Sequence, residues 1–201
     1  MIALTSVNKY LDNHYVQYQY SHDIDWFFLD GQYPIHCASN GGLLPNNIDK
    51  TVELQSLQVE VENMSAHHQF ELNIQAIEGY VGHHYEGINE AELLDRGMGI
   101  IPNGVTFLAN TPLWIKYYSW SFAKMAQRGF FSFDRIESSN KYYLVACPRE
   151  FAHLAGDVLN LIYKLPERTI SYIDQYDLFN DAVRFVSDID WIERMKKKDK
   201  M

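Results

Sequence analysis

The spacing of the apolar residues changes along this chain, and that change constrains the fold more than any other feature. Before residue 80, apolar and polar side chains alternate, most clearly in Phe70–Ala76, as they do in a strand with one buried face. Beyond residue 88, the apolar residues recur at the spacing of a helix. The sequence therefore predicts an α+β fold, with an antiparallel sheet built mainly from the N-terminal half and covered on one face by helices mainly from the C-terminal half.

The predicted strands are short segments in which aromatic and β-branched residues are frequent. Asp30-Gly31 separates two of these segments and suits the turn of a two-residue hairpin. Within residues 52–61 the apolar residues first occupy even-numbered and then odd-numbered positions. A bulge near Gln55-Ser56 would keep both sets on one face, so the sequence predicts a bulged strand here. The expected strands are residues 14–20, 25–29, 32–38, 52–61, 70–76, 130–136 and 141–146.

The predicted helices begin at capping residues or prolines and end at glycines or lysines. Thr111 is the expected N-cap of a helix that starts at Pro112 and ends at Gly129. The expected helices are residues 89–97, 112–129, 148–164 and about 174–197. The chain of 201 residues suits a single domain spanning residues 1–201, with a soft internal boundary near residues 79–87.

Charge and composition exclude several classes of function. The chain has 17 Lys and Arg against 26 Asp and Glu, a net charge of −9, which repels a phosphate backbone and argues against nucleic-acid binding. No apolar run approaches the roughly 20 residues that span a bilayer, and the N-terminal residues lack the pattern of a signal peptide. Two cysteines are too few for a disulfide scaffold. We therefore expect a cytoplasmic protein with reduced thiols and no membrane association.

Cys147 lies between the strand predicted at 141–146 and the helix predicted to start at Pro148. As the N-cap of that helix it would face unpaired backbone N–H groups, which lower the pKa of a thiol. His153 is expected on the polar face of the helix, too far beyond the cap to accept the thiol proton. We expect a buried structural cysteine, with a catalytic nucleophile as the alternative.

A second candidate site is the loop that contains Gly41-Gly42, where the backbone can approach a ligand closely. His36 and Cys37 offer a base and a nucleophile, and Asn40 offers hydrogen bonds. Because His36 and Cys37 are neighbours on a strand, their side chains point to opposite faces. We expect a tight turn at the sheet edge, with Asn40, Gly41 and Gly42 as candidate ligand-binding residues.

The two histidine doublets, His67-His68 and His83-His84, lie at opposite ends of the strand predicted at 70–76. That separation is too long for one coordination sphere. Glu86 and Glu90 could join the second doublet, but no HxH or HxxxH spacing supports a metal site. We therefore expect solvated loop histidines, no metal and no cofactor.

No motif in the sequence assigns an activity, and the chain could be an enzyme or a binding protein. The leading hypothesis is a non-enzymatic domain that binds a protein partner, or a second copy of itself, through an aromatic and acidic surface. Tyr117 and Trp120 form a second apolar row on the helix at 112–129, and Trp191 lies off the apolar stripe of the last helix. Tryptophan and tyrosine are frequent among the residues that dominate interface energies.

The alternative hypothesis is a small hydrolase or transferase that depends on a thiol or a histidine. Its site would gather around Gly41-Gly42, with Cys37 or Cys147 as the nucleophile and His36 as the acid or base. This hypothesis predicts one cysteine with a lowered pKa.

Overall fold

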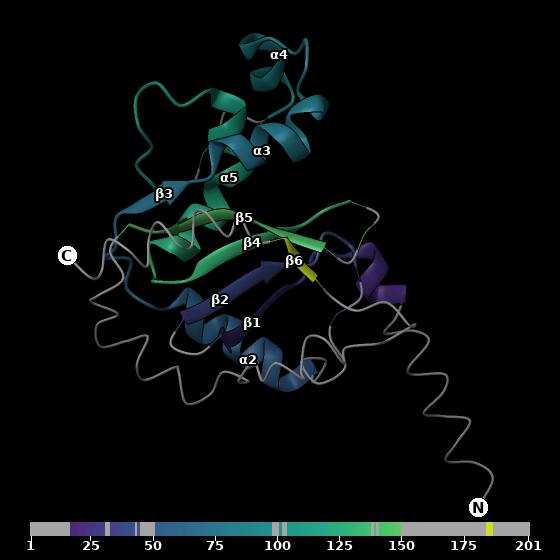
Figure 1. The fold of residues 1–201 in the computed structure, drawn as a ribbon, viewed down its shortest axis with the longest axis vertical. Helices are drawn as coiled ribbons and strands as arrows, with labels where there is room; N and C mark the ends of the chain where they lie inside the picture. Colours follow the sequence, from purple (N-terminus) through teal and green to yellow (C-terminus); the bar gives the residue numbers. More distant parts are fainter. Residues whose placement is uncertain are drawn as a thin grey trace, which may run out of the picture.

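The computed structural model describes residues 17–30, 33–42, 44, 51–97, 101, 104–137, 139, 141–149 and 184–186. Within them a mixed sheet has the strand order β1-β2-β4-β5-β3, and β6 pairs with the start of β5, whereas β3 pairs with its end (Figure 1). The strands are β1 (Asp25–Asp30), β2 (Tyr33–Ala38), β3 (Phe70–Leu72), β4 (Phe131–Arg135), β5 (Lys141–Pro148) and β6 (Arg184–Val186). The helices are α2 (Thr51–Glu62), α3 (Ile74–Val81), the 3₁₀ helix η1 (Gly82–His84), α4 (Glu90–Asp95) and α5 (Leu113–Ala126).

The predicted α+β class and the mostly antiparallel sheet are confirmed. β1 and β2 form the expected hairpin, with Asp30 opposite Tyr33, and β4 and β5 form the second expected hairpin. The helix predicted at 89–97 is α4, and the side chain of Asn89 accepts a hydrogen bond from Glu92 N at 3.0 Å. Strands in the described residues come from both halves of the chain.

Parallel pairing between β2 and β4 joins the two hairpins into one sheet. Because β1 runs antiparallel to β2 and β5 runs antiparallel to β4, the ends of β2 and β4 lie beside the starts of β1 and β5. Residues 39–130, which include α2, α3 and α5, form the connection between β2 and β4. This arrangement gathers residues from four strands at one edge of the sheet.

Buried side chains form two clusters, one on each face of the sheet. α2 packs into the first cluster through Leu57, whereas α3 and α5 pack into the second through Ile77 and Ile115 (Figure 1). From Tyr142 to Val145, the residues of β5 alternate between them, with Leu144 in the first and Val145 in the second. The described helices therefore cover both faces. None of them is long and apolar enough to cross a bilayer.

Three strands predicted in the N-terminal half are wrong in part or in full. Residues 17–21 are helical, and residues 51–62 form α2 because Leu54, Leu57 and Val61 bury one face at helical spacing. The strand predicted at 70–76 ends at Leu72, since the Asn73 side chain accepts a hydrogen bond from Ala76 N at 3.3 Å and caps α3. A short apolar run fits both the alternating spacing of a strand and the spacing of a helix, so it does not distinguish the two.

Two predictions for the C-terminal part are also corrected. Cys147 is not the N-cap of a helix, because β5 continues through Pro148, which pairs with Phe70 of β3; cysteine is in any case a poor cap. Arg184–Val186, inside the helix predicted at about 174–197, form β6 instead. The rest of that helix, Trp191 and residues 150–164 lie outside the described residues. Pro112, and not Thr111, is the N-cap of α5.

Candidate functional site

The described residues form an open cleft of about 700 Å³ at the sheet edge where four strands meet. Its walls combine rings with acids. The aromatic residues that line it are Tyr80, Tyr85, Tyr117, Tyr118, Trp120, Phe122 and Tyr143. The charged and titratable residues that line it are Asp23, Asp25, His84, Asp134, Arg135 and Glu137.

One row of the sheet forms the floor of this cleft. Asp25 of β1 pairs with Ala38 of β2, Ala38 pairs with Asp134 of β4, and Asp134 pairs with Tyr143 of β5. Directly paired residues share a face of the sheet, so their side chains project together. We call Asp25, Ala38, Asp134 and Tyr143 the floor row. The strand register is therefore what brings the two carboxylates together.

The next row on the same face carries the histidine that underlies the floor. His36 pairs with Phe27 and with Ser132, and its Nδ1 lies 2.6 Å from Ser132 Oγ. Its Nε2 lies 3.0 Å from Asp25 Oδ1. These residues are of the types found in a serine hydrolase triad, but the access is reversed: Ser132 is fully buried, whereas the Asp25 side chain is 42% exposed. Of these three side chains, the Asp25 carboxylate, and not the hydroxyl, is the one that a ligand can reach.

Three aspartates that line the cleft, Asp23, Asp25 and Asp134, differ in their affinity for protons. Burial raises the pKa of Asp134 to about 7, although hydrogen bonds from Tyr118 and from Arg135 N favour its charged form. Burial also raises the pKa of Asp23. For Asp25, burial opposes ionisation, but the charge of His36 and the contact with it outweigh burial, so that its pKa is lowered. Asp25 is therefore the most firmly ionised of the three.

A hydrogen-bonded pair of tyrosines, Tyr118 of α5 and Tyr143 of the floor row, connects the helix to the sheet. The hydroxyl of Tyr118 donates to Asp134 Oδ2 at 2.5 Å and forms a short hydrogen bond with the hydroxyl of Tyr143. Arg135 N donates to the other carboxylate oxygen of Asp134 at 2.8 Å. Burial and the Asp134 charge raise the pKa values of both tyrosines, which therefore remain neutral donors. This network fixes α5 over the sheet.

The loop after β2 closes one side of the cleft. Asn40 and Gly41 have left-handed backbones, with φ of 44° and 64°, which asparagine and glycine tolerate. The turn aims Asn40 N at Asp23 Oδ1, 2.7 Å away. A Cβ at Gly42 would overlap the Arg135 guanidinium, so a side chain here would push the end of the Arg135 side chain aside. The loop thus positions Asp23 and Arg135.

The structure brings together some of the residues predicted as sites. Asn40, Tyr117 and Trp120 line the cleft, and His36 contacts Asp25 beneath it. Cys37 and Cys147 are fully buried and are not joined in a disulfide, and both belong to the cluster that packs against α2. As predicted, consecutive positions separate His36 from Cys37. The catalytic and binding roles of these residues stay predictions.

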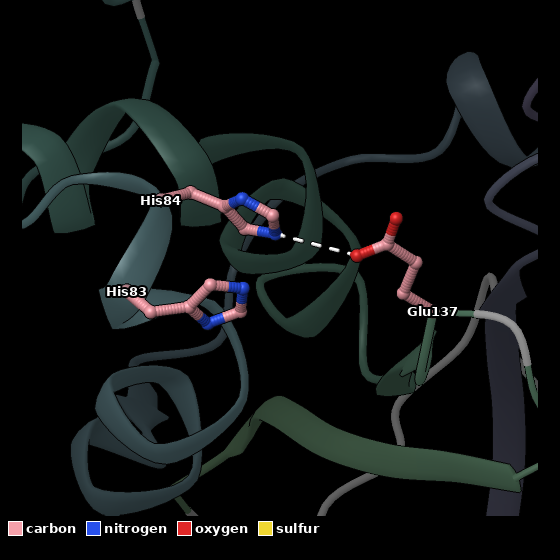
Figure 2. Close-up of side chains that lie close together, drawn as sticks. All are labelled: His83, His84 and Glu137. Atoms are coloured by element: carbon pink, nitrogen blue, oxygen red, sulfur yellow. Dashed lines mark ion pairs between the residues drawn. The ribbon is translucent and has the colours of Figure 1, made fainter.

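Histidines and a carboxylate also gather at the rim of the cleft. His83 and His84 of η1 lie beside Glu137, which follows β4, and the ligand atoms of these three residues all lie within 4.8 Å of one another (Figure 2). Glu137 replaces Glu86 and Glu90, the carboxylates considered from the sequence. We call His83, His84 and Glu137 the rim cluster.

Sequence reasoning missed the main carboxylates, Asp25 and Asp134. A signal existed for Asp25: a two-residue hairpin loop after Asp30 places Asp25 opposite Ala38 and Phe27 opposite His36. No comparable signal existed for Asp134, because the chain does not reveal that β4 pairs in parallel with β2. Comparisons with protein-family models, with curated proteins and with solved structures gave no match for this chain.

Proposed function

We propose that this chain is a binding domain that takes a cationic side chain of a protein partner, lysine or arginine, into the aromatic and acidic cleft. The observation that carries the proposal is the placement of an ionised carboxylate, Asp25, in a cleft lined by tyrosines and a tryptophan. A carboxylate supplies charge and hydrogen-bond acceptors, and aromatic faces attract the same cation.

The rings on α5 form the first part of the recognition surface. Tyr117 and Trp120 are only half-buried although both are large and partly apolar, and both line the cleft. A cation over a tryptophan or tyrosine face gains about 0.5–2 kcal/mol, depending on how far it is desolvated. Half-buried rings of this kind account for the second apolar row on α5.

The acids supply the second part. The described cleft carries Asp23, Asp25, Asp134 and Glu137 against Arg135 and His84, and the whole chain has a net charge of −9. Such a field increases the association rate of a basic partner and disfavours acidic ones. The buried His36 lies behind Asp25 and keeps this carboxylate charged without occupying its exposed side.

The direct test is titration of the protein with a fluorescent peptide rich in lysine and arginine. We expect Asp25→Asn to weaken binding about tenfold, since a hydrogen bond to a charged group is worth about 1.5–3 kcal/mol. Trp120→Leu keeps an apolar side chain but removes the ring, and we expect a loss of about three- to tenfold. The control peptide replaces each basic residue by glutamine and should not bind.

The matched control variant is Glu90→Gln, which removes one negative charge from an exposed residue of α4 that does not line the cleft. Its binding should be close to that of the wild type. Equal losses for Glu90→Gln and Asp25→Asn would mean that only the overall charge attracts the peptide, and the proposal would fail. Sedimentation of the wild type and of Trp120→Leu tests self-association: a dimer that Trp120→Leu dissociates would identify the partner as a second copy.

A second candidate function is a small hydrolase or transferase in the same cleft. The observation that favours it is the separation of the pKa values of Asp25, which is lowered, and Asp134, which is raised to about 7. Such separation is typical of a carboxylate pair that works as base and acid. In this version the carboxylates, with His36 behind Asp25, take the role that sequence analysis gave to a thiol.

Activity against chromogenic esters, glycosides and phosphates tests the second candidate. Turnover that Asp25→Asn and Asp134→Asn both abolish would support it, whereas turnover insensitive to both variants would exclude this cleft. The thiol version is tested by alkylation rates against pH in Cys37→Ser and Cys147→Ser. Ordinary titration near 8.5, the value of an unperturbed thiol, in both variants would remove its main support.

A further inference from the structure

We propose that the rim cluster, His83, His84 and Glu137, is a binding site for a divalent transition-metal ion of the zinc type. The ligand atoms of these residues lie within 4.8 Å of one another, and His84 Nε2 lies 3.6 Å from Glu137 Oε2. The two imidazole rings are 3.9 Å apart between centroids and extend from η1 toward the carboxylate (Figure 2). Within the part of the chain that the structure describes, no other group of three His, Cys, Asp or Glu residues lies close enough to share one ion.

The fold holds the two histidines in place from both sides along the chain. Tyr80, which precedes them on α3, packs against Tyr143 with a ring distance of 4.5 Å. Tyr85, which follows them, stacks on Trp114 of α5 at 4.9 Å, and Tyr85 N donates to Gly82 O at 2.9 Å. The short helix η1 is therefore anchored to the sheet and to α5, and its histidines start from a fixed backbone.

The carboxylate is held by a separate segment of the chain. Glu137 follows β4, where Ile136 N donates to Lys141 O at 2.8 Å and Ser139 N donates to Ile136 O at 3.1 Å. Ser139 Oγ donates to the same carbonyl at 2.9 Å. The turn that carries Glu137 thus belongs to the hairpin of β4 and β5. An ion bound here would join the segment after α3 to the segment after β4.

The ligand types decide the class of ion. Two imidazoles and one carboxylate suit zinc and neighbouring first-row ions, whereas calcium and magnesium prefer oxygen ligands alone. Three protein ligands leave a fourth position for water or for a ligand group, as in zinc sites that are not closed. Because His84 and Glu137 line the cleft, the ion would lie at the edge of the proposed binding surface.

Stability does not account for the cluster. His84 and Glu137 expose 51% and 71% of their side chains, and an ion pair so exposed to solvent contributes little to folding. The proposal reverses the expectation, drawn from the sequence, that these histidines are solvated loop residues without a metal. It does not depend on the cationic ligand proposed for the cleft, because that proposal is carried by Asp25 and Trp120, which are not part of the rim cluster, although His84 and Glu137 line the same cleft.

Calorimetric titration of the full chain with zinc chloride tests the site, with calcium chloride and magnesium chloride as comparisons. We expect one zinc ion per chain and no calcium or magnesium binding. His83→Ala, His84→Ala and Glu137→Gln should each weaken zinc binding more than about tenfold, at least the loss that follows removal of an outer-shell partner of a metal ligand. The controls are His67→Ala and His68→Ala, which alter the other doublet and should bind zinc as the wild type does.

Histidine NMR gives a second measurement on the same samples. The ring signals of His83 and His84 should shift on addition of zinc, and those of His67 and His68 should not. Absence of zinc binding, or zinc binding unchanged in all three rim variants, would overturn the proposal. A loss of equal size in the His67→Ala and His68→Ala controls would overturn it as well, because it would place the ion elsewhere.

Discussion

Two histidine–carboxylate contacts in this molecule are similar in composition and opposite in environment. His36 lies 3.0 Å from Asp25 and is 1% exposed, between Phe27 and Ser132 in a row of the sheet. His84 lies 3.6 Å from Glu137, and both side chains are about half exposed or more. The first contact is set by strand register, whereas the second is made by two segments at the surface.

This difference separates a buried histidine that stabilises the fold from exposed histidines that are available to a ligand. The imidazole of His36 is enclosed and acts on the cleft through Asp25, whose ionised form it favours. The imidazoles of the rim cluster face solvent and can exchange their partner for an ion. We therefore expect changes in His36 and in the floor row to alter stability and its pH dependence, in addition to any effect on binding, and changes in the rim cluster to alter ligand binding alone.

The largest expected effect concerns Asp134, whose folded-state pKa of about 7 exceeds the ordinary value of 3.8. Between these values the folded protein holds a proton that the unfolded chain has lost, so the free energy of unfolding falls as pH rises through this window. A difference of about three pH units corresponds to about 4 kcal/mol. Urea unfolding of wild type and Asp134→Asn should show the wild type losing this amount relative to the variant between about pH 4 and pH 8.

The comparison with Asp134→Asn cancels the contributions of Asp23 and Asp25, which are present in both proteins and shifted in opposite directions. A difference between the two proteins that does not change with pH would mean that Asp134 is not buried as its 6% exposure indicates. It would also remove the pKa separation on which the second candidate function rests.

The next effect distinguishes the two histidines directly. His36→Ala leaves a cavity and removes the partner of the buried Ser132 hydroxyl, and we expect a loss of about 3 kcal/mol in the free energy of unfolding. His84→Ala should cost less than about 0.5 kcal/mol, because its contact is exposed. Equal losses of unfolding free energy for the two variants, measured by urea unfolding at about pH 7, would contradict the contrast between the buried His36 and the exposed His84.

Local sequence patterns predicted well on which face of a strand a side chain lies, but predicted poorly which strands pair with one another. The opposite orientation of His36 and Cys37 follows from the pleat alone, and the hairpin at Asp30 fixes the register of β1 against β2. The partnership of Asp25 with Asp134 depends on pairing between strands separated by residues 39–130. No local pattern encodes which strand of a later hairpin pairs with an earlier one.

Helix and strand were confused where an apolar run was compatible with both periods. In α2 the buried residues Leu54, Leu57 and Val61 fit a helix, but the alternating Val59 suggested a strand; Val59 is 57% exposed. At Asn73 the deciding interaction is a side-chain cap on Ala76 N. Such outcomes depend on which face the rest of the fold covers, which the segment itself does not specify.

The most direct test of the account is whether Asp25 and Trp120 hold the same cationic group. A double-mutant cycle with Asp25→Asn and Trp120→Leu, measured as affinity for the lysine- and arginine-rich peptide, separates joint from independent action. We predict that the double variant loses less than the sum of the single losses, with a coupling energy of at least about 0.5 kcal/mol. Strictly additive losses, or no loss in either single variant, would contradict the claim that rings and acids form one site.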